Sequence, residues 1–127
     1  MTGENIVSLL AGAIVLCAVA FLFGAPPVHA GECRDMKVSW YGGHHEGRKT
    51  ASGEVFRSAG MTAAMMGRQH FGERWKLYYG KKSVTVRVND TGDFAKYGRG
   101  MDLSEAAFGR LAPTGKGVIP VRACRVG

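Results

Sequence analysis

The feature that most constrains the folding of this chain is an uncharged apolar run of 18 residues near its N-terminus, from Ile6 to Phe23. By contrast, all 17 Lys and Arg residues of the 127-residue sequence follow Ala30. A run of this length and composition is typical of an export signal or a membrane span. The folding unit is therefore residues 31–127. Its 97 residues suffice for one domain with a single modest core, which excludes a multidomain enzyme.

A candidate cleavage site follows the apolar run. Residues Gly24–Pro27 break a helix, and Val28–Ala30 resembles the small-residue pattern at which signal peptides are cut. We therefore expect residues 1–30 to be a signal peptide and the protein to be periplasmic or secreted. The alternative is an uncleaved inner-membrane anchor through residues 6–23. The run reaches the length of a membrane span, and residues 1–5 carry no Lys or Arg.

The cysteines agree with export. Cys17 lies in the apolar run, which leaves Cys33 and Cys124 at opposite ends of the exported part. In an oxidising compartment two such cysteines most simply form one disulfide, and two free thiols are the alternative. The exported part has no CxxC motif and no Cys/His cluster, and the adjacent His44 and His45 are typical of a solvated loop. We expect neither a metal nor a cofactor.

The remaining pattern is one of short β segments separated by glycines. Residues 84–88 alternate between Val and polar residues, and residues 37–41 and 118–126 are further candidate strands. The segment 61–66 contains helix-favouring Ala and Met but is too short to assign. One helix is predicted, with Asp102 as its cap, Glu105 completing a capping box, and Pro113 ending it. Short strands with one helix predict a mainly β fold, a small closed barrel.

Seven short motifs in register carry a family resemblance. They occupy nearly all of the exported part: Ser39–Gly42, Gly47–Phe56, Thr62–Ala64, Phe71–Gly72, Val86–Asp90, Asp102–Ser104 and Gly115–Val121. In order and spacing they resemble the rare lipoprotein A (RlpA) family. The resemblance implies that residues 31–127 form a six-stranded double-psi β-barrel with one short helix, preceded by the N-terminal signal or anchor helix. It also implies a peptidoglycan partner, or a related anionic cell-wall polysaccharide, because the characterised enzymes of the family are lytic transglycosylases.

A lytic transglycosylase needs one carboxyl group that acts first as an acid and then as a base. Asp90 is the best candidate because it ends the alternating strand and matches the family's barrel aspartate, although Asn89–Gly92 by itself reads as a turn. Glu54 is the second catalytic candidate, with an exposed loop glutamate as the alternative. Met65 stands where the family has a histidine, and a thioether cannot transfer a proton. His70 is therefore considered as a partial replacement. Asp93, three positions after Asp90, is considered as a second carboxylate whose repulsion would raise one pKa if both face the groove.

Substrate binding calls for aromatic faces surrounded by polar side chains. The resemblance and this requirement together give seven candidates: Trp40, Tyr41, Arg48, Thr50, Ser52, Asn89 and Asp102. Asp102 also has the simpler interpretation as a helix cap. Trp75, Tyr78 and Tyr79 lie between recognisable motifs, where ordinary packing explains them equally well.

The charge fits an exported protein. After loss of Glu4 the exported part carries a net charge of +8, spread along the chain. Export favours anionic wall polymers or an anionic membrane surface over nucleic acid, so we expect no nucleic-acid partner. Three functions follow as hypotheses: peptidoglycan transglycosylation, expansin-like binding or loosening without cleavage, and an anchored envelope-assembly domain with an unknown protein partner.

Overall fold

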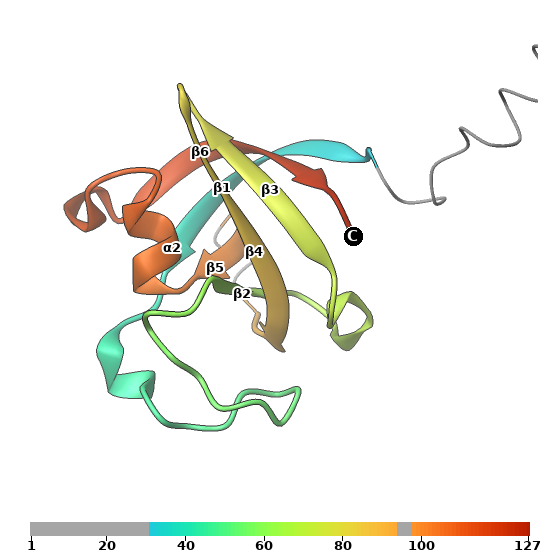
Figure 1. Ribbon diagram of the computed structural model, residues 1–127, viewed down its shortest axis with the longest axis vertical. Helices are drawn as coiled ribbons and strands as arrows, with labels where there is room; N and C mark the ends of the chain where they lie inside the picture. Colours follow the sequence, from blue (N-terminus) through green and yellow to red (C-terminus); the bar gives the residue numbers. More distant parts are fainter. Residues whose placement is uncertain (1–30, 94–97) are drawn as a thin grey trace, which may run out of the picture.

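A computed structural model describes residues 31–93 and 98–127, in which six strands close into a barrel (Figure 1). The expected signal or anchor, residues 1–30, lies outside the described residues. The strands are β1 (Cys33–Trp40), β2 (Thr62–Met65), β3 (Arg74–Tyr79), β4 (Lys82–Thr91), β5 (Arg99–Leu103) and β6 (Val118–Arg125). Within the described residues there is one short α-helix, α2 (Glu105–Gly109), which follows β5 and precedes β6 in the sequence. The predicted six-stranded double-psi barrel with one helix is confirmed.

The order of strands around the barrel is β1-β5-β2-β4-β3-β6. Two of the neighbouring pairs, β1/β5 and β2/β4, are parallel, and the other pairs are antiparallel. Each parallel pair contains a shift of register, at Lys37/Val38 and at Ala63/Ala64. In this order the short strand β2 lies between β4 and β5, and neither of these strands is next to β2 in the sequence. This arrangement brings residues from distant motifs to one edge of the barrel.

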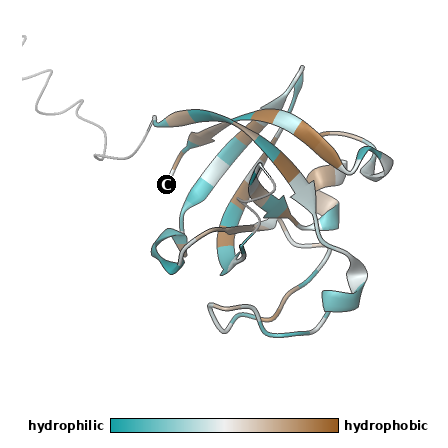
Figure 2. Ribbon diagram, turned by 180° about the vertical axis from the view of Figure 1, so that it is seen from behind, coloured by the Kyte–Doolittle hydropathy of each residue, from teal (hydrophilic) through white to brown (hydrophobic). Residues whose placement is uncertain are grey.

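The core follows the two-residue period of the strands. In β4 the predicted alternation holds, with Val84, Val86 and Val88 facing inward, and the strand extends beyond the predicted residues 84–88. Trp75 and Leu77 of β3 are fully buried beside them. Figure 2 shows hydrophobic and hydrophilic residues alternating along the barrel strands. The candidate strands at 37–41 and 118–126 are found as β1 and β6, and segment 61–66 forms the buried strand β2.

The predicted helix cap is wrong. Ser104 caps α2: its backbone is extended, and its hydroxyl oxygen accepts the backbone N–H of Ala107 at 3.2 Å. The same hydroxyl donates to the carbonyl of Gly60, which ties the start of the helix to the loop before β2. Asp102 instead lies within β5, two residues before the cap. Its side chain is thereby available for another role.

The predicted disulfide is present. Cys33 of β1 and Cys124 of β6 are directly paired across the antiparallel ladder, and a bond joins their sulfurs. The bond closes a loop of 91 positions, which spans almost the whole barrel.

We expect removal of this disulfide in a Cys33→Ser/Cys124→Ser variant to lower the free energy of unfolding by up to about 4 kcal/mol, since a long unfolded loop regains its freedom. Urea unfolding followed by circular dichroism measures the change. The unmutated protein in a reducing agent should lose stability to a similar extent. An unchanged urea midpoint in both cases would contradict this assignment of stability.

Candidate active site

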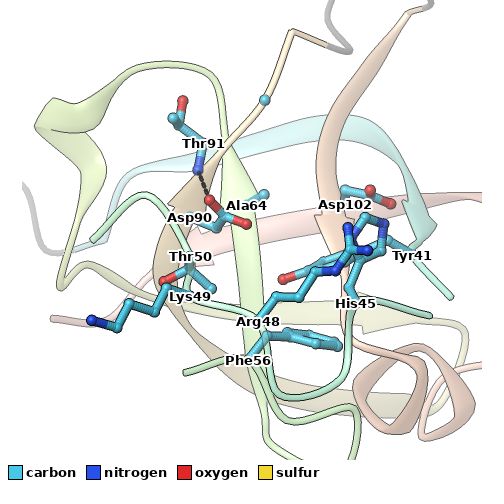
Figure 3. Close-up of a pocket in the computed structure, with 11 residues that line it drawn as sticks. Tyr41, His45, Arg48, Lys49, Thr50, Phe56, Ala64, Asp90, Thr91 and Asp102 are labelled. Atoms are coloured by element: carbon cyan, nitrogen blue, oxygen red, sulfur yellow. Dashed lines mark hydrogen bonds between the residues drawn. The ribbon is translucent and has the colours of Figure 1, made fainter. Parts of the chain in front are cut away.

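A cavity of about 350 Å³ lies where β2, β4 and β5 meet the long segment between β1 and β2 (Figure 3). Its lining combines two carboxyl groups, two aromatic rings, three basic side chains and small or hydroxyl-bearing residues. These residues are Tyr41, His45, Arg48, Lys49, Thr50, Phe56, Ala64, Asp90, Thr91, Gly92 and Asp102.

The two carboxyl groups lie on either side of one alanine. Ala64 of β2 is paired with Asp90 on the parallel strand β4 and with Asp102 on the antiparallel strand β5. The methyl group of Ala64 occupies little space, so the cavity between the two aspartates stays open. Barrel closure therefore places both aspartates at one site.

Asp90 is held by backbone donors. Its Oδ1 accepts the N–H of Ala51, from the long loop, and the N–H of Thr91, both at 2.9 Å (Figure 3 shows the second bond). None of the residues that the structure describes donates a hydrogen bond to the other oxygen, Oδ2. The strand β4 continues to Thr91, so the interpretation of Asn89–Gly92 as only a turn is wrong. The carboxyl group is fixed in orientation and keeps one oxygen for a ligand.

Asp102 is a half-buried carboxyl group. Burial raises its pKa, and the negative charge of Asp90 adds to this effect. Opposing contributions come from the Ser39 hydroxyl, which donates to Oδ1 at 2.9 Å, and from the charges of Arg99 and His45. The guanidinium of Arg99 in turn donates to the Ser39 oxygen at 2.7 Å. Asp102 is thus a carboxyl group that holds its proton more readily than an exposed aspartate does.

Aromatic rings form one wall of the cavity. The rings of Tyr41 and Phe56 lie 4.6 Å apart between centroids, and the ring of His45 meets Tyr41 edge-on at 5.6 Å. The Tyr41 hydroxyl is buried near the Thr62 hydroxyl, and neither group forms a hydrogen bond of good geometry with a described residue. Burial, followed by the charges of Asp90 and Asp102, raises the pKa of this hydroxyl strongly, so it remains a donor. A buried donor without a partner beside two carboxyl groups is suited to a polar ligand.

The loop that carries the basic side chains has a defined turn. Lys49 and Val55 form an isolated antiparallel bridge. The backbone and hydroxyl of Thr50 both donate to the carbonyl of Glu54 at 2.8 Å. Gly53 adopts a φ of 89°, a left-handed conformation that favours glycine. This turn holds Arg48 and Lys49 at the cavity.

Five of the predicted site residues line the cavity: Tyr41, Arg48, Thr50, Asp90 and Asp102. The other predicted residues do not. Ser52 is exposed and lies 3.0 Å from the Thr50 hydroxyl. Asn89 is buried, and its Oδ1 has no partner among the described residues. Trp40 donates its indole N–H to the carbonyl of Thr114, and its ring lies against Phe108.

Glu54 is not placed as a proton donor. Its two carboxylate oxygens accept hydrogen bonds from the guanidinium of Arg87, at 2.5 and 2.7 Å. Arg87 lowers the pKa of Glu54, so the group is held in its ionised form. The side chain is exposed and lies outside the cavity lining. Its contact with β4 is suited to holding the loop.

The two predicted assisting groups are also elsewhere. His70 contacts Glu73 at 2.9 Å, in a separate cluster where Glu73 also accepts from Trp75 and pairs with Arg125. Asp93 is exposed and does not line the cavity. The expectation that either one assists Asp90 is therefore not supported by its position.

Met65 does not bear on the chemistry of the cavity directly. It is 3% exposed and packs in the hydrophobic core, whereas its neighbour Ala64 faces the cavity. The position that resembles the family's histidine is therefore occupied here by a core side chain.

Sequence reasoning missed six lining residues: His45, Lys49, Phe56, Ala64, Thr91 and Gly92. Three of them, Lys49, Phe56 and Thr91, lie within or next to motifs that supplied other candidates, and Ala64 lies in the motif Thr62–Ala64, which supplied none. The motif positions were a usable signal, but the sequence does not say which members of a motif face the cavity.

Within residues 31–93 and 98–127 no group of three His, Cys, Asp or Glu side chains is arranged to hold a metal ion. The same residues contain no helix of the length and apolar character needed to cross a membrane.

Comparison with known proteins gives consistent matches. The family model described as lytic transglycolase matches residues 34–123. An endolytic peptidoglycan transglycosylase RlpA from Campylobacter jejuni is 36% identical over 97 residues, which cover 75% of this chain and 34% of that protein. The chain spans between a fifth and two fifths of the length of the curated relatives it matches.

Two solved structures share the fold. Streptomyces papain inhibitor matches with a TM-score of 0.66 at 21% identity, over 80% of this chain and 100% of that one. A variant expansin of Clavibacter michiganensis in complex with cellohexaose matches with a TM-score of 0.63 at 20% identity, over 76% of this chain and 51% of that one.

We expect Asp102→Asn to raise the Tm at pH 7 by a few degrees. Because burial raises the pKa of Asp102 above that of the unfolded chain, ionisation of this group costs stability once the pH exceeds the unfolded value. The gain should shrink as the pH falls and vanish below the ordinary value of 3.8, where both states are protonated.

Calorimetric melting from pH 3 to pH 8 measures this effect. Asp35→Asn, which changes an exposed aspartate, is the matched control and should alter the Tm little at any pH. A Tm for Asp102→Asn below that of the unmutated protein at pH 7 would contradict the assignment.

Proposed function

Because this chain belongs to the lytic transglycolase (RlpA-like) family of double-psi β-barrels, we propose that it cleaves peptidoglycan glycan strands without adding water, in the cavity around Ala64. The observation that carries the proposal is the pair of aspartates on either side of Ala64. In this pair, Oδ1 of Asp90 accepts two backbone hydrogen bonds, and none of the described residues donates one to Oδ2.

In this reaction Asp90 acts twice. As an acid it protonates the oxygen of the glycosidic bond, and the bond from this oxygen to C1 breaks while positive charge develops at C1. As a base its carboxylate then takes the proton of the C6 hydroxyl of the same sugar, and O6 bonds to C1. The products are a 1,6-anhydro-ended strand and a strand with a free hydroxyl, and Asp90 regains its proton.

Asp102 is better suited to support than to direct transfer. One of its oxygens is already engaged by the Ser39 hydroxyl, whose oxygen in turn accepts from Arg99. Across Ala64 from Asp90, it is placed to exchange a hydrogen bond with a sugar hydroxyl.

The other lining groups are suited to holding a glycan strand. The rings of Tyr41 and Phe56 offer apolar surface to a sugar face, and the unpartnered Tyr41 hydroxyl offers a donor. Arg48 and Lys49 place positive charge where the carboxylates of a peptidoglycan strand would lie. The RlpA protein of C. jejuni, named as a peptidoglycan transglycosylase, supports this substrate.

The test is incubation of the full chain with purified peptidoglycan and with strands stripped of stem peptides. Mass spectrometry should find 1,6-anhydro-ended sugars from the unmutated protein. Asp90→Asn should lower their yield at least about 100-fold, since the loss of a general acid/base typically costs this much. Glu54→Gln should cause a smaller loss, because Glu54 acts only on the loop.

Glu105→Gln, an exposed carboxyl change on α2, is the control and should leave the yield unchanged. Products with ordinary reducing ends would indicate hydrolysis and contradict the mechanism. Binding without any product would instead favour the expansin-like alternative.

The proposal includes export, with residues 1–30 as a cleaved signal. The sequence of these residues supports it, and so does the disulfide between Cys33 and Cys124, since such bonds persist in oxidising compartments. We expect intact-mass measurement of the protein recovered from the periplasm or the medium to give a chain that starts at Gly31. A membrane-bound chain that retains residues 6–23 would show the anchored alternative instead.

A further inference from the structure

We propose that the outer face of the sheet formed by β1, β6 and β3 is a second binding site, for an anionic glycan. This inference rests on one part of the proposed function, that the protein binds wall polysaccharide, and does not require that it cleaves it. The face is called the outer basic face below. It comprises Asp35, Lys37, Lys76, Tyr78, Pro120 and Arg122.

The outer basic face lies on the half of the barrel opposite the cavity. The cavity is built on the consecutive strands β5, β2 and β4, and the remaining strands of the closed ring are β3, β6 and β1. The middle strand β6 pairs with β1 on one side and with β3 on the other. The two sites share no residue, so both can be occupied at once.

Strand alternation and register place its side chains in a row. In β3 Trp75 and Leu77 are buried, so Lys76 and Tyr78 face outward. Tyr78 is paired with Arg122 of β6, and Arg122 is paired with Asp35 of β1. These three side chains therefore lie next to one another across three strands.

An exposed aromatic ring lies at the centre of this row. The side chain of Tyr78 is 40% exposed, and the Lys76 ammonium lies 5.3 Å from its ring centroid. A hollow of about 480 Å³ next to it is lined by Lys37, Tyr79 and Pro120, among others. A flat ring with a cation beside it and a hollow along one side fits a sugar that carries a negative group.

The net positive charge of the outer basic face favours an anionic ligand. Lys37, Lys76 and Arg122 carry three positive charges on this face, against the single negative charge of Asp35. The pair between Arg122 and Asp35 is 3.3 Å long, with side chains 58% and 83% exposed. An exposed pair of this kind contributes little, so an anionic ligand can replace Asp35 as the partner of Arg122.

A glycan fits better than a membrane surface. Tyr78 is the one exposed large hydrophobic side chain among the described residues that line this hollow. A membrane-binding face inserts several apolar side chains between the lipids, in addition to its cations. A glycan strand needs only ring faces and charge, and the carboxylates of peptidoglycan supply the anions.

The test measures binding apart from cleavage, with the full chain carrying Asp90→Asn so that the ligand stays intact. Co-sedimentation gives the Kd for intact peptidoglycan sacculi, which are anionic, and for chitin, which is neutral. Three variants are compared in this background: Lys76→Gln/Arg122→Gln, Tyr78→Thr, and the control Arg110→Gln/Lys116→Gln. The control removes the same charge from exposed positions outside both hollows.

We expect Lys76→Gln/Arg122→Gln to weaken binding to sacculi about fivefold, and Tyr78→Thr about threefold, as for exposed contacts of modest strength. The control pair should change the Kd by less than about twofold. Chitin binding should weaken only in Tyr78→Thr. Unchanged Tm values for all variants exclude a folding effect.

Equal losses in both charge pairs would overturn the proposal, because they would show attraction by net charge alone. Unchanged binding in every variant would also overturn it. The same variants are also tested with phosphatidylglycerol vesicles. Weaker binding of the variants to these vesicles, with unchanged binding to sacculi, would assign the face to a membrane and overturn the proposal. Absence of anhydro-ended products from the chain with Asp90 intact would contradict the proposed function and leave this result standing.

Discussion

The whole site depends on the pairing of the short strand β2 with β4 on one side and β5 on the other. This pairing brings Asp90 and Asp102, twelve positions apart in the sequence, to the two sides of Ala64. Because β2 is only four residues long, few hydrogen bonds hold this part of the barrel. The other strands complete the closed barrel. On the half of the barrel opposite β2, the disulfide covalently joins β1 to β6.

The site combines groups that stabilise the fold with groups that do not. The N–H of Ala51 fixes Asp90, and the Glu54–Arg87 pair holds the same loop on β4. In contrast, the half-buried carboxyl of Asp102, whose ionised form burial disfavours, and the unpartnered hydroxyl of Tyr41 cost stability in the empty cavity. Polar groups that cost stability in a rigid frame are what a preorganised binding site requires, since a ligand can complete their hydrogen bonds.

Much of the fold could be predicted from local patterns. The alternating valines of residues 84–88 indicated a strand because alternate side chains in a strand face opposite sides. Asp102 could not be placed this way: the spacing to Glu105 imitates a capping box, and Ser104, two residues later, has the extended backbone that a cap needs. The short segment 61–66 was also undecided, because its strand conformation comes from pairing with β4 and β5.

The sequence by itself determined the class of fold, the disulfide partners and the leading carboxyl candidate, Asp90, because strand period, cysteine number and motif order are local or countable properties. Only the tertiary structure decided which side chains share the cavity. It placed Asp102 and Tyr41 beside Asp90, and it set Glu54, His70 and Asp93 apart. The physical reason is that barrel closure, through the register of β2 with its two neighbours, decides which distant residues meet.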